Sequence, residues 1–328
     1  MATNNNNNNK FLFIVENGYN TCYISSLLMS LFYKPSYLDN ILNCDPKSAC
    51  YFYLQDIIKI KFVDNVRKNI SVSAEIMNEI RNYCNICGWK NENINEIINQ
   101  QDVNEFYTFI IDAMNIYPIE IQRHTITEAL SNENDTGRIE KIPFINLTIP
   151  TQDNLTNTKD NNILKKKEDN KKDELSVKEL LNNWLNHNIV DIKREIINDF
   201  GEKEIKYVKA LNIYKVMNVP LFVAISINRF SSIESKKNKI KIDIKKKIKL
   251  HNTGENKGIK WKIHSIICHK GETIRTGHYY SIIFGSDNKW LIFDDLIIPS
   301  LKQVNIKDTA IMNKIKEECV FLIYTYDG

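Results

Sequence analysis

A cysteine and a histidine stand in segments whose residues suit nucleophilic catalysis. Cys22 begins an apolar run in which Ile24, Leu27 and Leu31 recur at helical spacing, so the thiol should lie in the first turn of a helix. A helix N-terminus and a nearby imidazole both favour the thiolate form of a cysteine. His278, in the run Gly-His-Tyr-Tyr, is the base that we expect beside Cys22.

Two acidic residues follow the second of two predicted strands. A first strand begins with the segment 277–281, and a second strand spans 290–293. Asp294 and Asp295 directly follow this second strand. Antiparallel pairing of these strands brings a carboxylate beside His278, where it orients the imidazole and fixes its tautomer. Alternation along the strand indicates only that one of the two carboxylates faces the ring.

Helical periodicity dominates the first part of the chain, and strand alternation dominates the rest. Helices are predicted at 51–62, 74–86, 103–114 and 177–185, and strands at 142–149, 206–214, 221–228, 259–269, 279–284, 290–293 and 320–326. Ser176 and Glu179 form a predicted capping box before the last helix. The Asn-rich start at 1–10 and the polar insertion at about 151–174 carry too few apolar residues to fold alone, so we expect disorder there.

Composition and charge limit the classes of function. A chain of 328 residues with 43% hydrophobic residues can bury one large core or two smaller ones. Basic residues exceed acidic ones by only four (44 against 40), so nucleic acid is not an expected partner. The chain has neither an apolar run of membrane-span length nor the basic and apolar parts of a signal peptide at its start. With seven cysteines, we expect a reducing, intracellular and cytoplasmic location and no membrane partner.

Three segments, taken in order, carry a family resemblance. They are Asn-Gly-Tyr-Asn-Thr-Cys-Tyr at 17–23, Gln-Gln-Asp-Val-Asn-Glu-Phe at 100–106, and the histidine run with Trp-Leu-Ile-Phe-Asp-Asp at 290–295. Together they resemble the ubiquitin-specific proteases, the papain-like deubiquitinating cysteine peptidases, over about residues 12–327. The resemblance implies an α+β fold for 11–328. It divides this domain into a helical thumb at about 11–115 and an antiparallel-sheet palm with reduced fingers at about 116–328.

The same resemblance implies catalytic roles for residues of this chain. Cys22 matches the nucleophile and His278 the general base that later acts as an acid. Asp294 matches the orienting acid by family position, with Asp295 as the alternative. Asn17 matches the asparagine whose side-chain amide stabilises the tetrahedral intermediate, together with a backbone N–H near Cys22.

The resemblance also implies the substrate. Asp102 matches the aspartate that holds the backbone of the ubiquitin tail, and Gly277 and Tyr279 are expected to line the path of that tail. The implied reaction is hydrolysis of the peptide or isopeptide bond after the C-terminal glycine of ubiquitin, through an acyl-enzyme. The expected partners are ubiquitin and ubiquitin-conjugated proteins, and no metal or other cofactor is expected.

Two departures from the family pattern leave other functions open. Tyr19 stands where the family has glycine, at a turn that often needs a permissive backbone, and Ser25 stands where it has asparagine. A ubiquitin-binding module with weak or no catalysis therefore remains an alternative. A second alternative is a protease for another ubiquitin-like modifier, because no sequence motif indicates contacts with the globular body of the modifier. A scaffold that binds nucleic acid through 236–249 ranks last.

The cysteine pattern excludes the zinc ribbon that many relatives carry in their fingers. No cysteine lies between Cys87 and Cys268, so the ligands of such a ribbon are missing. Cys84 and Cys87 form a CxxC pair in the helical part, with Cys44 and Cys50 as possible companions. Their spacing is poor for zinc, and we expect buried free thiols.

Overall fold

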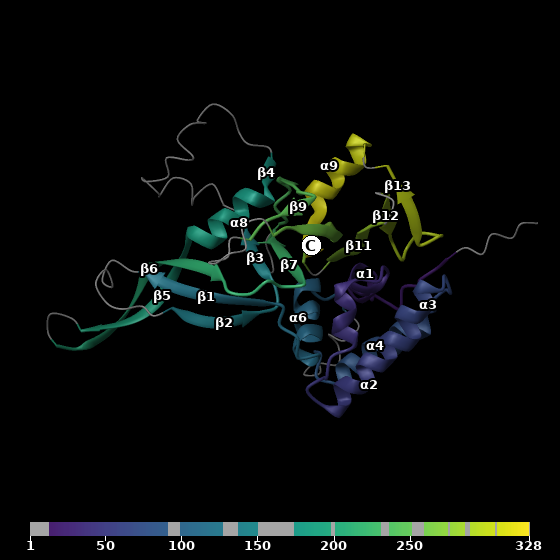
Figure 1. Cartoon of the computed structure of the whole chain (residues 1–328), viewed down its shortest axis with the longest axis horizontal. Helices are drawn as coiled ribbons and strands as arrows, with labels where there is room; N and C mark the ends of the chain where they lie inside the picture. The colour runs from purple at the N-terminus through teal and green to yellow at the C-terminus, as the bar shows by residue number, and fades with distance from the viewer. Residues whose placement is uncertain are drawn as a thin grey trace, which may run out of the picture.

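The computed structural model separates helices and sheets into distinct regions (Figure 1). It describes residues 13–90, 99–126, 137–149, 174–197, 201–230, 236–250, 259–274, 276–285, 289–305 and 307–327. The predicted Asn-rich start at 1–10 and the insertion predicted at 151–174, apart from Glu174, lie outside these residues. The regions are a helical thumb, a palm sheet beside it and a second sheet that reaches away from the thumb.

The thumb consists of helices from the first part of the chain. They are α1 (Cys22–Phe32), η1 (Tyr37–Leu42), α2 (Ala49–Ile57), η2 (Ile58–Val63), α3 (Asp64–Arg67), α4 (Ala74–Ile86) and α6 (Val103–Ala113). Every residue of α1 is buried, because α1 packs against α4 and α6 on the thumb side and against the palm sheet. Among the described residues, no helix has the length and apolar character needed to cross a membrane.

The palm is a sheet of eight strands. Its order is β13 (Leu301–Val304), β12 (Trp290–Phe293), β11 (Thr276–Phe284), β10 (Trp261–Thr273), β14 (Cys319–Tyr326), β7 (Phe222–Asn228) and β3 (Ile145–Thr148), with β9 (Lys247–Ile248) paired to β10. The pairs are antiparallel except for β3 and β7, which run parallel. One hydrophobic core joins Leu27 of α1 to Ile267 of β10 and Ile283 of β11, which fixes the start of α1 against the palm.

The second sheet forms the fingers. Its order is β2 (Arg138–Ile142), β1 (Ile119–Ile126), β6 (Lys203–Val216) and β5 (Asn188–Ile197), while β4 (Glu174–Ser176) pairs with β8 (Lys241–Asp243). The predicted capping box of Ser176 and Glu179 opens α8 (Val177–Asn186), and Trp184 of α8 stacks on Tyr214 with ring centroids 4.5 Å apart. The fingers lack the cysteine ligands of a zinc ribbon. Their sheet nevertheless contains a long strand, because β6 spans 14 residues.

Two of the thumb cysteines form a disulfide, so the prediction of free thiols is wrong for them. Cys50 near the start of α2 and Cys87 just after α4 are bonded, because the packing of α2 on α4 brings their Cα atoms to 5.8 Å. Cys44 and Cys84 are free, as predicted, although Cys44 is only partly buried. The disulfide also removes two of the four sulfurs of the rejected zinc site.

Candidate active site

Cys22 is the first residue of α1 and lies buried in the core shared by thumb and palm. The preceding residue, Thr21, does not cap the helix with its side chain, whose Oγ1 instead accepts a hydrogen bond from the Gly18 N–H at 2.8 Å. The positive end of the helix dipole therefore acts on the Cys22 thiol without a side-chain cap from Thr21. The thiol lies where the helical spacing of the sequence predicts it.

His278 and Asp294 meet through the pairing of β11 with β12. Ser281 pairs with Phe293 in this antiparallel ladder, which places His278 near the end of β12. His278 donates from Nε2 to Asp294 Oδ1 at 2.7 Å, and its ring also hydrogen-bonds the Cys22 side chain. Because Nε2 is engaged by Asp294, Nδ1 is the ring nitrogen that faces the thiol.

These contacts set the protonation state of His278. Burial by itself lowers the pKa of an imidazole, but hydrogen bonds with Asp294 and Cys22 outweigh burial and raise the pKa of His278 to about 10. Burial likewise acts to raise the pKa of Asp294, yet His278 and the Leu296 N–H hold it below its usual range. At neutral pH the site therefore holds an imidazolium between a carboxylate and the cysteine.

Asp295 lies near the imidazole but is bonded to other groups. Its Oδ2 accepts from Ser25 Oγ at 2.7 Å and from Asn17 Nδ2 at 3.2 Å. Its Oδ1 stands 3.9 Å from His278 Nε2 and has no hydrogen-bond partner among the described residues. Burial raises the pKa of this carboxyl in spite of these donors. Both carboxylates thus lie beside the ring, but only Asp294 hydrogen-bonds it.

The loop before Cys22 takes a left-handed backbone without glycine. Tyr19 and Asn20 have φ values of +59° and +54°. Arg81 of α4, which is buried, donates from Nη1 to the Tyr19 carbonyl oxygen at 2.6 Å and from Nη2 to Asn78 Oδ1 at 2.6 Å. Arg81 could not be found from the sequence, because no local signal in α4 connects it to a loop so far away in the chain.

Both the oxygen and the nitrogen of the Asn17 side-chain amide form hydrogen bonds. Its Oδ1 accepts from the Thr21 N–H at 3.3 Å, while Nδ2 donates to Asp295. An amide nitrogen carries two hydrogens, so one remains for a further acceptor. Ser25, at the position where the resemblance expects asparagine, supports the same carboxylate from α1.

Asp102 and Tyr279 come together at the other segment that the sequence singles out. Asp102 is the N-cap of α6, and its Oδ1 accepts from the N–H groups of Asn104 at 2.6 Å and Glu105 at 3.2 Å. Burial raises the pKa of Asp102 despite these bonds. Tyr279 is buried within electrostatic range of Asp102 and bonds the backbone of Val103, which links β11 to the start of α6.

Gly277 is required by a close approach within the palm. A Cβ at this position would stand 2.5 Å from His269 Nε2 and 2.5 Å from the Lys270 carbonyl oxygen. His269 is buried and contacts Gln100 through Nε2 at 2.9 Å. Burial, with the nearby charges of Lys237 and His278, lowers the pKa of His269 to about 3, so this ring is neutral. His269 lies in a predicted strand, but no motif around it indicates this contact with Gln100.

A papain-like arrangement, with a cysteine on the first turn of a thumb helix and a histidine and aspartate on the palm sheet, defines a thiol hydrolase. The family model described as ubiquitin carboxyl-terminal hydrolase matches residues 15–324. The chain belongs to this family and is a deubiquitinating cysteine protease.

Individual relatives agree with this assignment. Ubiquitin carboxyl-terminal hydrolase 8 of Saccharomyces cerevisiae is 24% identical over 348 aligned residues, which cover 93% of this chain and 68% of the yeast protein. The Ubp8/Sgf11/Sus1/Sgf73 deubiquitinase module of SAGA, solved with ubiquitin aldehyde, contains a chain that superposes with a TM-score of 0.62 at 18% identity, covering 97% of this chain and 70% of that one. Another structure of this module gives a TM-score of 0.60 at 17% identity, covering 97% and 68%. These superpositions confirm the predicted fold.

Proposed function

We propose that Cys22, His278 and Asp294 form the catalytic triad that releases ubiquitin from its conjugates. The observation that carries the proposal is the position of the His278 ring, bonded to Asp294 on one side and to Cys22 on the other. A pKa of about 10 keeps His278 protonated at neutral pH, so the ring holds the proton that the leaving amine needs.

The reaction then runs in two acyl transfers. The Cys22 thiolate attacks the carbonyl carbon of the C-terminal glycine of ubiquitin, and the His278 imidazolium gives its proton to the departing lysine amine. The thioester that forms is attacked by water, whose proton passes to His278. Cys22 leaves as a thiolate, and the second product is ubiquitin with a free carboxyl group, which loses the remaining proton to solvent.

Asn17 is the proposed donor to the oxyanion of both tetrahedral intermediates. Its Nδ2 keeps one hydrogen for this purpose while the other binds Asp295, which preorganises the amide. Such a donor contributes about 3 kcal/mol to transition-state stabilisation. The N–H of Cys22 at the start of α1 is the second proposed donor.

The ubiquitin tail is proposed to run past Asp102, Gly277 and Tyr279. Gly277 is exposed directly before His278, which fits a tail that passes over this backbone, while the buried Tyr279 supports the path by bonding the start of α6. We propose ubiquitin and its conjugates as partners, rather than nucleic acid or a membrane. The proposed location is the cytoplasm, whose reducing conditions keep the Cys22 thiol free and also act on the Cys50–Cys87 disulfide.

A ubiquitin that carries an electrophile at its C-terminus tests the proposal. We expect a covalent adduct with the wild type and none with Cys22→Ala. Cys44→Ala removes the one free thiol that is only partly buried among the described residues, and this variant should still form the adduct.

Other outcomes of this experiment favour the alternatives. Adducts only with probes built on another ubiquitin-like modifier would indicate a protease for that modifier. A folded protein that binds ubiquitin but forms no adduct would indicate a binding module.

A further inference from the structure

Three consecutive aliphatic residues are exposed directly after the two active-site carboxylates. Leu296 and Ile298 are each 64% exposed, and Ile297 is 40% exposed. Exposed aliphatic side chains are ordinary when they are scattered, but an unbroken exposed run is unfavourable unless it serves a contact.

The loop that carries these residues is closed at its base. The Asp294 N–H donates to the Ser300 carbonyl at 2.8 Å, and the Ile297 N–H donates to the Asp294 carbonyl at 3.3 Å. Ser300 is itself tied to the start of the chain, because its N–H donates to the Phe13 carbonyl at 3.1 Å and its Oγ accepts from the Val15 N–H at 3.0 Å. The tip is therefore presented on a fixed base.

This tip is tied to the carboxylate that holds His278, the group that must protonate the leaving amine. The Leu296 N–H donates at 3.0 Å to Asp294 Oδ1, the oxygen that also accepts from His278 Nε2. The lysine nitrogen of a conjugate must come within hydrogen-bond distance of the His278 ring to receive its proton. The four-carbon stem of that lysine then keeps the acceptor backbone close to the tip.

We propose that Leu296 and Ile298 bind an apolar side chain adjacent to the modified lysine, and so select which acceptor proteins are cleaved. The inference rests on the proposed function. The occupant is the acceptor segment rather than ubiquitin, because the tail of ubiquitin is assigned to the surface around Asp102 and Tyr279. Burial of aliphatic tips against an apolar neighbour supplies the preference.

Two conjugates that differ only beside the lysine test the proposal. In each, the C-terminal carboxyl of ubiquitin is joined to the lysine of a short peptide, which has leucine on both sides of the lysine in one conjugate and serine in the other. The measured quantity is the ratio of the two kcat/KM values. We expect the wild type to prefer the leucine conjugate by about tenfold, the scale of a single hydrophobic contact in substrate selection.

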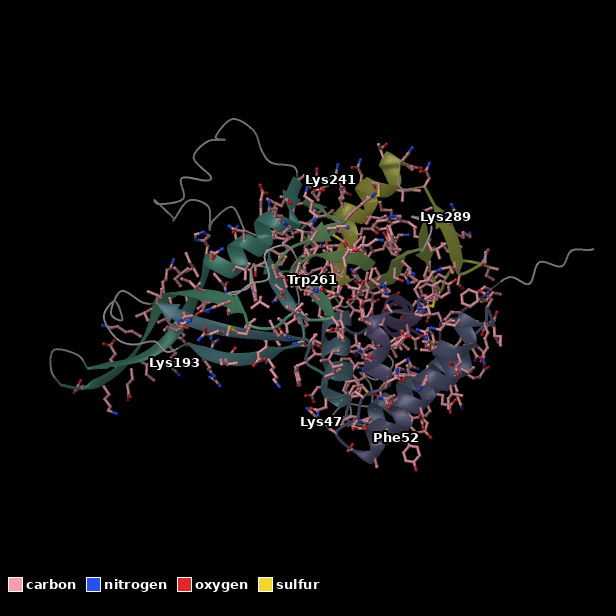
Figure 2. The ribbon with its side chains drawn as sticks, viewed as in Figure 1. Lys47, Phe52, Lys193, Lys241, Trp261 and Lys289 are labelled. Carbon is pink, nitrogen blue, oxygen red and sulfur yellow. A yellow bond between two sulfur atoms is a disulfide. The ribbon has the colours of Figure 1, made fainter. Side chains whose placement is uncertain are left out.

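The variants identify the residues responsible. Leu296→Ser combined with Ile298→Ser should bring the ratio close to one. Ile298→Ser alone, which leaves the residue bonded to Asp294 unchanged, should lower the ratio partway. Phe52→Ser on α2, which Figure 2 labels at the outer end of the thumb, replaces a 51% exposed apolar side chain and should keep the wild-type ratio.

A wild-type ratio near one, or a preference that survives the double substitution, would overturn the inference while leaving the proposed function in place. If the wild type cleaves neither conjugate, the proposed function fails and the inference falls with it.

Discussion

Arg81 donates a hydrogen bond of 2.6 Å to the carbonyl oxygen of Tyr19, three residues before Cys22. Tyr19 has a φ of +59°, a conformation in which a Cβ is unfavourable. Its side chain is 81% exposed and meets no obstacle, so the cost lies in the backbone. A buried guanidinium that is also fixed to Asn78 can hold this peptide in a conformation that glycine adopts more readily.

A double-mutant cycle tests this compensation. Arg81→Met should lower kcat about tenfold in the wild-type background, because it leaves the Tyr19 carbonyl without its charged donor. In the Tyr19→Gly background the loss should be less than about threefold, since glycine adopts a positive φ without help. Tyr19→Ala is the matched control and should keep the full loss, because alanine retains a Cβ. Equal losses in all three backgrounds would rule out the coupling.

The pH profile of kcat/KM tests the proton held by His278. Burial lowers the pKa of His278, but the bonds of His278 with Asp294 and Cys22 outweigh burial and raise this pKa to about 10. Activity should therefore fall as the pH rises through about 10, because the imidazolium is lost. Asp294→Asn removes the carboxylate charge, so this falling limb should move to lower pH, and kcat should drop by about 10³- to 10⁴-fold.

An exposed carboxylate on α6 provides the control for charge alone. Asp112→Asn should leave both kcat and the falling limb unchanged, because Asp112 bonds Lys47 and Tyr117 rather than the active site. If the activity of Asp294→Asn falls at the same pH as that of the wild type, a group other than His278 sets the pH dependence of kcat/KM.

Asp295→Asn should separate the placement of Asn17 from the orientation of the imidazole. Because Asp295 Oδ2 holds the Asn17 amide, the substitution should lower kcat by about tenfold or more. The falling limb should move to lower pH by less than in Asp294→Asn, since Asp295 acts on the ring only by its charge at 3.9 Å and does not hydrogen-bond it. Ser25→Ala, which removes the other donor to the same oxygen, should cost less. A limb that moves as far as in Asp294→Asn would show that the two carboxylates act equally on the ring.

The Cys50–Cys87 disulfide should stabilise the thumb. Its removal in Cys50→Ser combined with Cys87→Ser should lower the free energy of unfolding by about 2 to 4 kcal/mol, because the crosslink restricts the unfolded chain across a separation of 37 residues. Urea unfolding without reductant measures the change, and Cys44→Ser serves as the control for loss of a thiol. If reductant leaves the wild-type unfolding curve unchanged, the pair does not contribute.

Local patterns were sufficient for most regular elements and for the reactive groups. The apolar spacing after Cys22 produced α1, alternation around His278 produced β11 and β12, and the Ser176 capping box produced the start of α8. These features follow from contacts between residues near in sequence, so the sequence carries them. The finger strands β1 and β5 were missed, because their residues are largely exposed or half-buried and are held by pairing with β6 instead of by an apolar face.

The sequence by itself determined which groups can react, namely a thiol at a helix start and an imidazole with acids on the following strand. Only the tertiary structure decided which distant partners support them. Arg81 reaches Tyr19 across 62 residues, and Asn17 reaches Asp295 across 278. It also decided that Asp294 takes the imidazole while Asp295 takes the asparagine. Such contacts depend on how α1, α4 and the palm pack together, and no spacing within one segment specifies that packing.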